Sequence, residues 1–163
     1  MLRPTHLDDS PALLRLAEAT AFFKPHEIEA LDEVLTDYHA ANRDYGHRCV
    51  TLTDAEQAET ILGFAYFAPT AMTDRTWELW WLAVDPTVQG RGHGRTLLDF
   101  FEAEVLARSG RLMLIETSGT PLYAGTRGFY LKAGYVVVAE IPDFYADGDG
   151  KVIYSRRPSP LVF

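Results

Sequence analysis

An apolar segment from Thr76 to Val84 leads through Asp85-Pro86 into a glycine-rich loop, and an amphipathic segment follows that loop directly. The apolar segment is rich in Trp, Leu and Val, which is typical of a buried strand. After the loop, apolar residues recur at helical spacing: Leu97, Leu98, Phe101 and Val105. The sequence therefore predicts a strand–loop–helix unit, in which the glycines let the backbone approach a ligand at the start of a helix.

The other segments alternate between helical and strand-like patterns. Ser10 and Pro11 suit an N-cap and a first helical position, and a second helix is expected to start near Pro25. Strands are expected where β-branched and aromatic residues concentrate, at residues 1–3, 48–53, 60–68, 76–84, 111–117, 135–141 and 151–155. A helix near residues 121–132 and a Pro-, Asp- and Gly-rich loop over 142–150 complete the order. This order predicts an α/β or α+β fold with helices on the faces of a sheet.

Length and composition place the chain among single-domain globular proteins. At roughly 150 residues per domain, the 163 residues predict one domain over 1–163. The 23 acidic and 15 basic residues give a net charge of −8, which disfavours binding to a nucleic acid. No apolar run reaches the roughly 18 residues of a membrane span, and the N-terminus lacks a signal-peptide core. The one cysteine, Cys49, excludes an internal disulfide, so we expect a cytoplasmic protein without a membrane or nucleic-acid partner.

The loop from Gln89 to Arg95 is the strongest chemical signal. Its glycines precede a helix, where unpaired amides and the helix dipole attract anions, and Arg91 and Arg95 add positive charge. A P-loop would need Lys after its last glycine, but Gly94 is followed by Arg95 and Thr96. The third glycine also comes one residue early for a dinucleotide-binding loop. The alternative is a flexible connection with capping glycines, which does not account for Gln89 or the arginines.

Three motifs in order resemble the GNAT superfamily, the GCN5-related N-acetyltransferases. Gln89-x-x-Gly92-x-Gly94 is similar to its pyrophosphate signature, and Leu82-Ala83-Val84-Asp85-Pro86 is similar to the strand end before it. The segment from Thr126 to Tyr135 resembles the end of a later helix in that family. The resemblance covers nearly the whole chain. It implies a mixed, mostly antiparallel sheet of six to seven strands, with helices on both faces and a splayed central strand pair.

The resemblance also implies where acetyl-CoA would bind as co-substrate. Residues of the loop would hold the pyrophosphate, chiefly through backbone amides: Gln89, Gly90, Arg91, Gly92, His93, Gly94 and Arg95. The main chain of Leu82, Ala83 and Val84 would pair with the pantetheine arm. Tyr123 stands where the family often has Asn, so its hydrogen bond to that arm depends on a phenol. For His93, a solvated loop histidine is the alternative to a phosphate contact.

Two residues are the expected catalytic groups. Tyr130 matches the family's general-acid tyrosine, and a well-placed phenol can supply a proton to a departing thiolate. The alternative is an aromatic pair with Phe129 that only packs the helix on the sheet. Glu78 is the candidate base because a carboxylate within an apolar strand is costly unless it faces a wet cleft. Its alternative is a solvent-facing strand residue, with water taking the proton.

The acceptor end is expected in the first two helices and the last hairpin. Phe22 and Phe23 could line a pocket or staple the helix. The loop over 142–150 gathers three carboxylates and two aromatics, which would suit a cationic amine, although turns favour Asp and Gly on their own account. Glu116 could face the acceptor or cap a turn.

Together these features predict an acetyl-CoA-dependent N-acetyltransferase acting on a primary amine of a small molecule or a peptide. The alternative is a non-catalytic module that binds or senses acyl-CoA. A homodimer is expected from the family. No metal site is expected because His39, Asp44 and His47 lack metal-ligand spacing. Cys49 has no recognisable His partner and is expected to be a buried strand residue.

Overall fold

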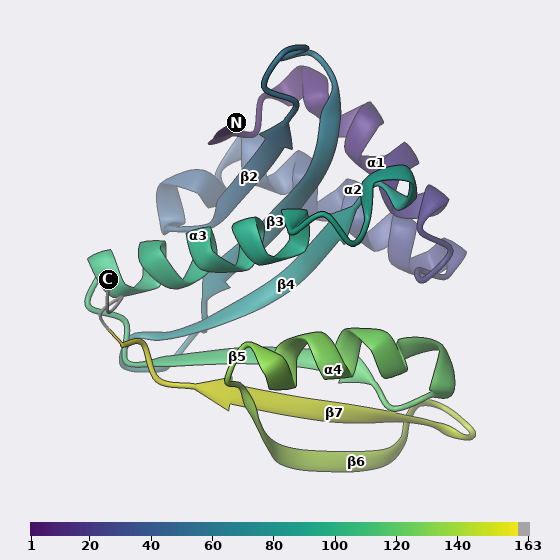
Figure 1. Cartoon of the computed structure of the whole chain (residues 1–163). Helices are drawn as coiled ribbons and strands as arrows, with labels where there is room; N and C mark the ends of the chain where they lie inside the picture. Colours follow the sequence, from purple (N-terminus) through teal and green to yellow (C-terminus); the bar gives the residue numbers. More distant parts are fainter. Residues whose placement is uncertain (160–163) are drawn as a thin grey trace. The chain divides into compact units, whose positions relative to one another are not determined.

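Seven strands form one mixed sheet in the computed structural model, which describes residues 1–159 (Figure 1). Their order across the sheet is β1-β2-β3-β4-β5-β7-β6. The strands are β1 (Leu2–Pro4), β2 (Arg48–Thr53), β3 (Ile61–Pro69), β4 (Thr76–Val84), β5 (Leu112–Ser118), β6 (Val136–Ala146) and β7 (Asp149–Arg156). β4 pairs with β5 in parallel, whereas β1–β2, β2–β3, β5–β7 and β6–β7 are antiparallel. The predicted mixed, mostly antiparallel architecture is therefore confirmed.

In the described part of the chain, four α-helices accompany the sheet: α1 (Ser10–Ala19), α2 (Pro25–Ala40), α3 (His93–Ala107) and α4 (Ala124–Lys132). Among residues 1–159, no helix has the length and apolar character needed to cross a bilayer. The chain divides into two compact units. The N-terminal unit comprises residues 1–69 and 80–101, and the C-terminal unit comprises residues 70–79 and the described chain from 102 to 159. β4 and α3 each contribute residues to both units.

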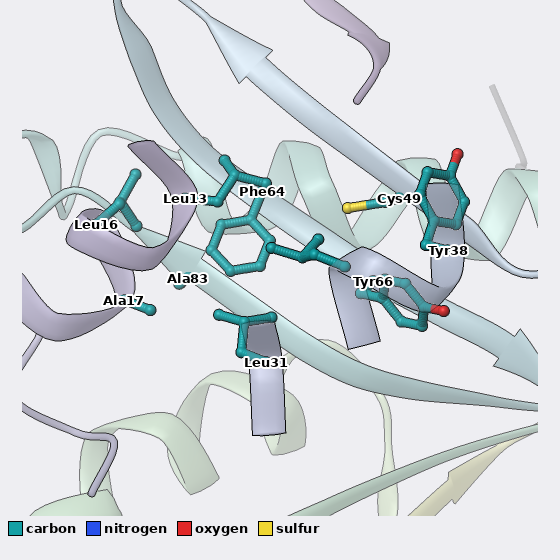
Figure 2. Packing of buried hydrophobic residues seen from close by; sticks show 10 residues of the cluster. Leu13, Leu16, Ala17, Leu31, Tyr38, Cys49, Phe64, Tyr66 and Ala83 are labelled. Atoms are coloured by element: carbon teal, nitrogen blue, oxygen red, sulfur yellow. The ribbon is translucent and has the colours of Figure 1, made fainter. Parts of the chain in front are cut away.

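The core of the N-terminal unit lies against β3. Phe64 and Tyr66 of this strand pack in a buried cluster with α1 and α2 (Figure 2). The next residue, Phe67, instead contacts Phe101 of α3 with ring centroids 5.0 Å apart. Because successive strand residues point to opposite faces, helices cover β3 on both sides. This explains its nearly continuous apolar sequence.

The predicted apolar stripe of α3 is confirmed, since Leu97, Leu98, Phe101 and Val105 are fully buried. The predicted N-cap of α1 is wrong. A short 3-10 turn, Leu7–Asp9, precedes the helix, so Asp9 takes the N-cap position. The Asp9 carboxylate accepts hydrogen bonds from Arg3 and from the backbone of His6. Ser10 Oγ is buried without a hydrogen-bond partner among the described residues.

Two further boundaries differ from the prediction. α3 begins at His93, so His93 and Gly94 belong to its first turn rather than to the loop. The expected loop over 142–150 is largely strand, because β6 continues to Ala146 and β7 begins at Asp149. The polar residues in this stretch are accommodated by a register shift between Ile141 and Ala146 instead of by an open loop.

Candidate functional site

The loop before α3 presents backbone amides at a helix N-terminus. The backbone N–H of Thr96 donates to the carbonyl of Gly92 at 3.0 Å, which is a first-turn bond of the helix. The amides of His93, Gly94 and Arg95 precede that bond and have no acceptor within the helix. Together with the helix dipole, they form a place where an anionic group is stabilised.

The two glycines of this loop are required by backbone conformation. Gly90 has φ +77° and Gly92 has φ +88°, a region that L side chains rarely adopt. A Cβ added at either position would meet nothing within 4 Å. The loop therefore borders open space, and a pyrophosphate of acetyl-CoA fits the donors that the residues present.

Side-chain bonds hold the loop to the end of β4. Gln89 Nε2 donates to the carbonyl of Val84 at 3.2 Å. Asp85 accepts hydrogen bonds from the backbone and hydroxyl of Thr87, at 2.8 and 2.6 Å, and these bonds lower the pKa of its carboxyl. Gln89, expected among the cofactor-binding residues, thus supports the loop. No supporting role was predicted for Asp85 or Thr87, although Asp followed two residues later by Thr is a turn signal.

The two loop arginines differ in their surroundings. Arg95 Nε lies 2.7 Å from a carboxylate oxygen of Asp99, one turn further along α3, and both side chains are exposed. Its charge is therefore partly compensated by that carboxylate. Arg91 is exposed and forms no ion pair with any residue of the described chain. Of the two, Arg91 is better placed to meet an incoming anion.

Trp80 and Trp81 of β4 both contact aromatic rings just before Leu82, Ala83 and Val84. The ring of Trp80 lies 5.5 Å from that of Tyr66, and the ring of Trp81 lies 5.1 Å from that of Phe23. Both partners belong to or pack against the α1–α2 side of β3. Both tryptophan rings therefore lie beside the core of the N-terminal unit, immediately before the segment expected to pair with pantetheine.

Tyr130 is buried on α4 in the C-terminal unit, with 5% of its surface exposed. Its ring packs against those of Tyr135 and Tyr154, at centroid distances of 6.1 and 5.9 Å. Burial raises the pKa of Tyr130 above its usual value. The phenol is therefore protonated at neutral pH, as a proton donor must be.

Glu78 lies on the opposite face of this part of the sheet. It pairs with Leu114 of β5, whereas Tyr154, which contacts Tyr130, pairs with the adjacent residue Ile115. Paired residues of neighbouring strands share a face, and adjacent residues of one strand do not. Glu78 therefore projects from the sheet face opposite to that of Tyr154, against which Tyr130 of α4 packs. Glu116, two residues after Leu114, projects from the same face as Glu78.

The expected cation-binding rings of the last hairpin contact a lysine of the chain itself. Lys151 Nζ lies 3.7 Å from the ring centroid of Phe144 and 5.7 Å from that of Tyr145. The same ammonium group is 2.6 Å from a carboxylate oxygen of Glu116. Glu116 therefore pairs across the sheet instead of capping a turn, and a cationic acceptor would have to compete with Lys151.

The carboxylates of the same hairpin also have local partners. Asp143 accepts from the backbone of Gly148 at 2.7 Å, and Asp149 accepts from Ser118 Oγ at 2.6 Å. The first bond favours the turn interpretation for Asp143, and the second holds Asp149 to the end of β5.

Tyr123 is half-buried and ends a 3-10 turn, Pro121–Tyr123, at the start of α4. Arg127 holds this turn by donating to the carbonyls of Ser118 and Thr120, at 3.0 and 2.7 Å. The position of Tyr123 is thus set by contacts with the end of β5.

Cys49 is a buried residue of β2, as predicted, and burial raises the pKa of its thiol to about 12. It is therefore not a thiolate nucleophile at neutral pH. Within residues 1–159, no group of three or more His, Cys, Asp or Glu side chains could hold a metal ion.

Comparisons with known proteins agree with this architecture. The sequence profile of the acetyltransferase (GNAT) family matches residues 12–135. A solved structure from Desulfovibrio desulfuricans, described as a GNAT-family acetyltransferase, is 34% identical with a TM-score of 0.91, over 98% of this chain and 99% of that one. A search of curated protein sequences finds no significant match.

More distant structures share the fold. The aminoglycoside 6'-N-acetyltransferase from Enterococcus faecium has a TM-score of 0.75 at 19% identity, over 100% of this chain and 99% of that one. The yncA protein from Salmonella typhimurium, solved with acetyl-CoA, has a TM-score of 0.78 at 17% identity, over 100% and 96%. From the profile match and the 34% identical structure, the chain belongs to the GNAT family of acetyltransferases.

Proposed function

We propose that the protein transfers an acetyl group from acetyl-CoA to a primary amine, by direct attack of the amine in a ternary complex. The observation that carries the proposal is the glycine loop at the start of α3, with unpaired helix amides and open space beside Gly90 and Gly92. This arrangement suits the pyrophosphate of a coenzyme A thioester. Acetyl-CoA supplies the activated acetyl group, and its thiol leaves.

The chain's residues would divide the work as follows. Amides of Gly90 to Arg95 bind the pyrophosphate, and Arg91 adds charge. The main chain of Leu82 to Val84 aligns the pantetheine arm and donates toward the thioester carbonyl as negative charge develops there. Tyr123 contacts the arm through its phenol.

The chemical step needs two proton transfers. The attacking amine must be neutral and must lose a proton, which Glu78 accepts either directly or through a water molecule. Tyr130 donates its phenolic proton to the sulfur as the thiolate departs. A thiolate whose conjugate thiol has a pKa of about 8.5 is a modest leaving group, and a well-placed phenol can supply its proton as it departs.

The acceptor is proposed as a small molecule or a peptide that carries a primary amine. Support for a small molecule comes from the fold shared with aminoglycoside acetyltransferases. A panel of amines, with release of coenzyme A thiol as the readout, tests the proposal. Binding of acetyl-CoA without thiol release from any amine would favour a module that only senses the cofactor.

We also propose a cytoplasmic location, which the single buried thiol of Cys49 fits. A homodimer is proposed as well, and light scattering would test it.

Acetyl-CoA should stabilise the protein measurably. At 100 times its dissociation constant, a ligand raises the free energy of unfolding by about 2.7 kcal/mol, which a thermal-shift assay detects.

Gly92→Ala should weaken binding of acetyl-CoA about tenfold, because a left-handed residue with a side chain costs roughly 1–2 kcal/mol and distorts the loop.

Gly148→Ala is the matched control for strain. Gly148 has φ +78° and also borders open space, but it lies in the turn between β6 and β7. This variant should lose similar stability and keep the wild-type affinity for acetyl-CoA. Stabilisation by ATP or NAD in place of acetyl-CoA, or equal affinities for Gly92→Ala and the wild type, would contradict the assigned loop.

Glu78→Gln should lower kcat about 10²-fold and leave the KM for acetyl-CoA unchanged, because the variant cannot accept the amine's proton. Steady-state kinetics at saturating amine measure this. Glu116→Gln is the comparison, since Glu116 lies on the same sheet face but is held by Lys151. If both variants retain wild-type kcat, bulk water takes the proton and Glu78 is not the base.

A further inference from the structure

Tyr154 of β7 carries a buried hydroxyl that has no partner. Its side chain is 0% exposed, and its Oη bonds to no atom of the described residues. Nearly all buried polar groups in folded proteins are hydrogen-bonded, because an unmade bond costs stability. A phenylalanine would pack equally well at this position without that cost. The hydroxyl therefore does not stabilise the free protein, and its presence needs a functional explanation.

The neighbouring ring of Tyr130 offers an explanation for the unpaired hydroxyl of Tyr154. The two rings lie 5.9 Å apart between centroids and are tilted by 45°, where α4 packs on β7. The other phenol beside Tyr130 is Tyr135, whose hydroxyl already donates to Met113 Sδ at 3.8 Å. Tyr154 thus has the unused hydrogen-bonding capacity next to Tyr130.

The charged groups around these rings are paired with each other. Arg156 of β7 donates to Glu102 of α3 at 2.6 Å, and the Arg156 guanidinium lies 5.9 Å from the ring centroid of Tyr135. Arg156 is thus engaged by Glu102 beside Tyr135, and a carboxylate has no proton to donate. Tyr154 is the neighbouring group left to donate to an ionised Tyr130.

We propose that Tyr154 is a positioning residue whose hydroxyl donates a hydrogen bond to the Tyr130 oxygen once Tyr130 has given up its proton. This rests on the proposed function of Tyr130 as the acid. In that step the Tyr130 O–H bond breaks and an S–H bond forms on the departing thiol. Tyr130 is left as a phenolate in an apolar layer, where an ion without a donor is costly. Glu78 passes the amine's proton on to the solvent, and the solvent later returns one proton to Tyr130, so protons balance over the cycle.

Tyr154→Phe tests the proposal with opposite effects on stability and on rate. The variant should melt no lower than the wild type, because it removes only an unpaired hydroxyl. Its kcat should fall about tenfold, in the range typical of one charge-stabilising hydrogen bond, while the KM for acetyl-CoA stays within about two-fold. Tyr135→Phe is the matched control: it removes a bonded hydroxyl from a neighbouring ring, and it should keep wild-type kcat.

The same substitution in a Tyr130→Phe background separates this proposal from the one it rests on. With no phenolate to stabilise, Tyr154→Phe should then change kcat less than about two-fold. If Tyr130→Phe alone slows turnover but Tyr154→Phe does nothing, or costs the same factor in both backgrounds, the role of Tyr154 is overturned and that of Tyr130 stands. If Tyr130→Phe keeps wild-type kcat, the acid assignment itself fails.

Discussion

Replacing Tyr130 with Phe should lower kcat about 10²- to 10³-fold while the dissociation constant for acetyl-CoA stays within about two-fold of the wild-type value. The ring is retained, so its packing against Tyr135 and Tyr154 is retained as well. Only the proton donor for the departing thiolate is lost. Thiol-release kinetics give kcat, and calorimetric titration gives the affinity.

Tyr123→Phe provides the comparison for this variant. It also removes one phenolic hydroxyl from the region of α4, but from a residue proposed to contact the pantetheine arm. Its expected effect is a higher KM for acetyl-CoA with nearly unchanged kcat. Wild-type turnover in Tyr130→Phe would mean that this residue only packs the helix on the sheet.

Phe101→Ala should lower the free energy of unfolding by about 3–5 kcal/mol, the usual range for a buried aromatic replaced by alanine. Phe101 is fully buried and contacts Phe67 of β3 at 5.0 Å. The loss includes the cavity left between α3 and β3, which a packed core fills only in part. Chemical denaturation of Phe101→Ala and of the wild type in the same buffer measures this loss of stability.

The adjacent residue offers a control of the same chemistry. Phe100 also contacts Phe67, at 6.3 Å, but is only half-buried. Phe100→Ala should therefore cost less than half as much as Phe101→Ala. Equal losses would show that α3 is not held on β3 through its predicted apolar stripe. Since the glycine loop leads into α3, a large loss should also weaken acetyl-CoA binding.

Most elements were predictable because their patterns are local. The apolar stripe of α3 and the strand expected over residues 60–68 were both predicted from such patterns, and the structure confirms a buried stripe and β3 at Ile61–Pro69. Boundaries were less predictable. Ser10 has the side chain of a good N-cap, but a 3-10 turn before it moves the cap to Asp9, whose carboxylate is held by Arg3. That choice depends on a partner on β1.

The candidate site was predictable to a similar degree. The glycines of the loop could be recognised because a helix N-terminus needs no side chains to attract an anion. The supporting bond from Gln89 to the Val84 carbonyl, and the pairing of Arg95 with Asp99, could not be assigned from spacing alone. Each side chain could equally have faced a ligand.

By itself, the sequence determined the strand–loop–helix unit, the element order and the family, since these depend on periodicity and on a few glycines. Only the tertiary structure decided how the polar groups are partnered. It directs Lys151 onto Phe144 and Glu116, and it leaves the hydroxyl of Tyr154 unpaired beside Tyr130. The physical reason is that burial and hydrogen bonding depend on which distant segments meet, and this information is absent from the spacing of residues along the chain.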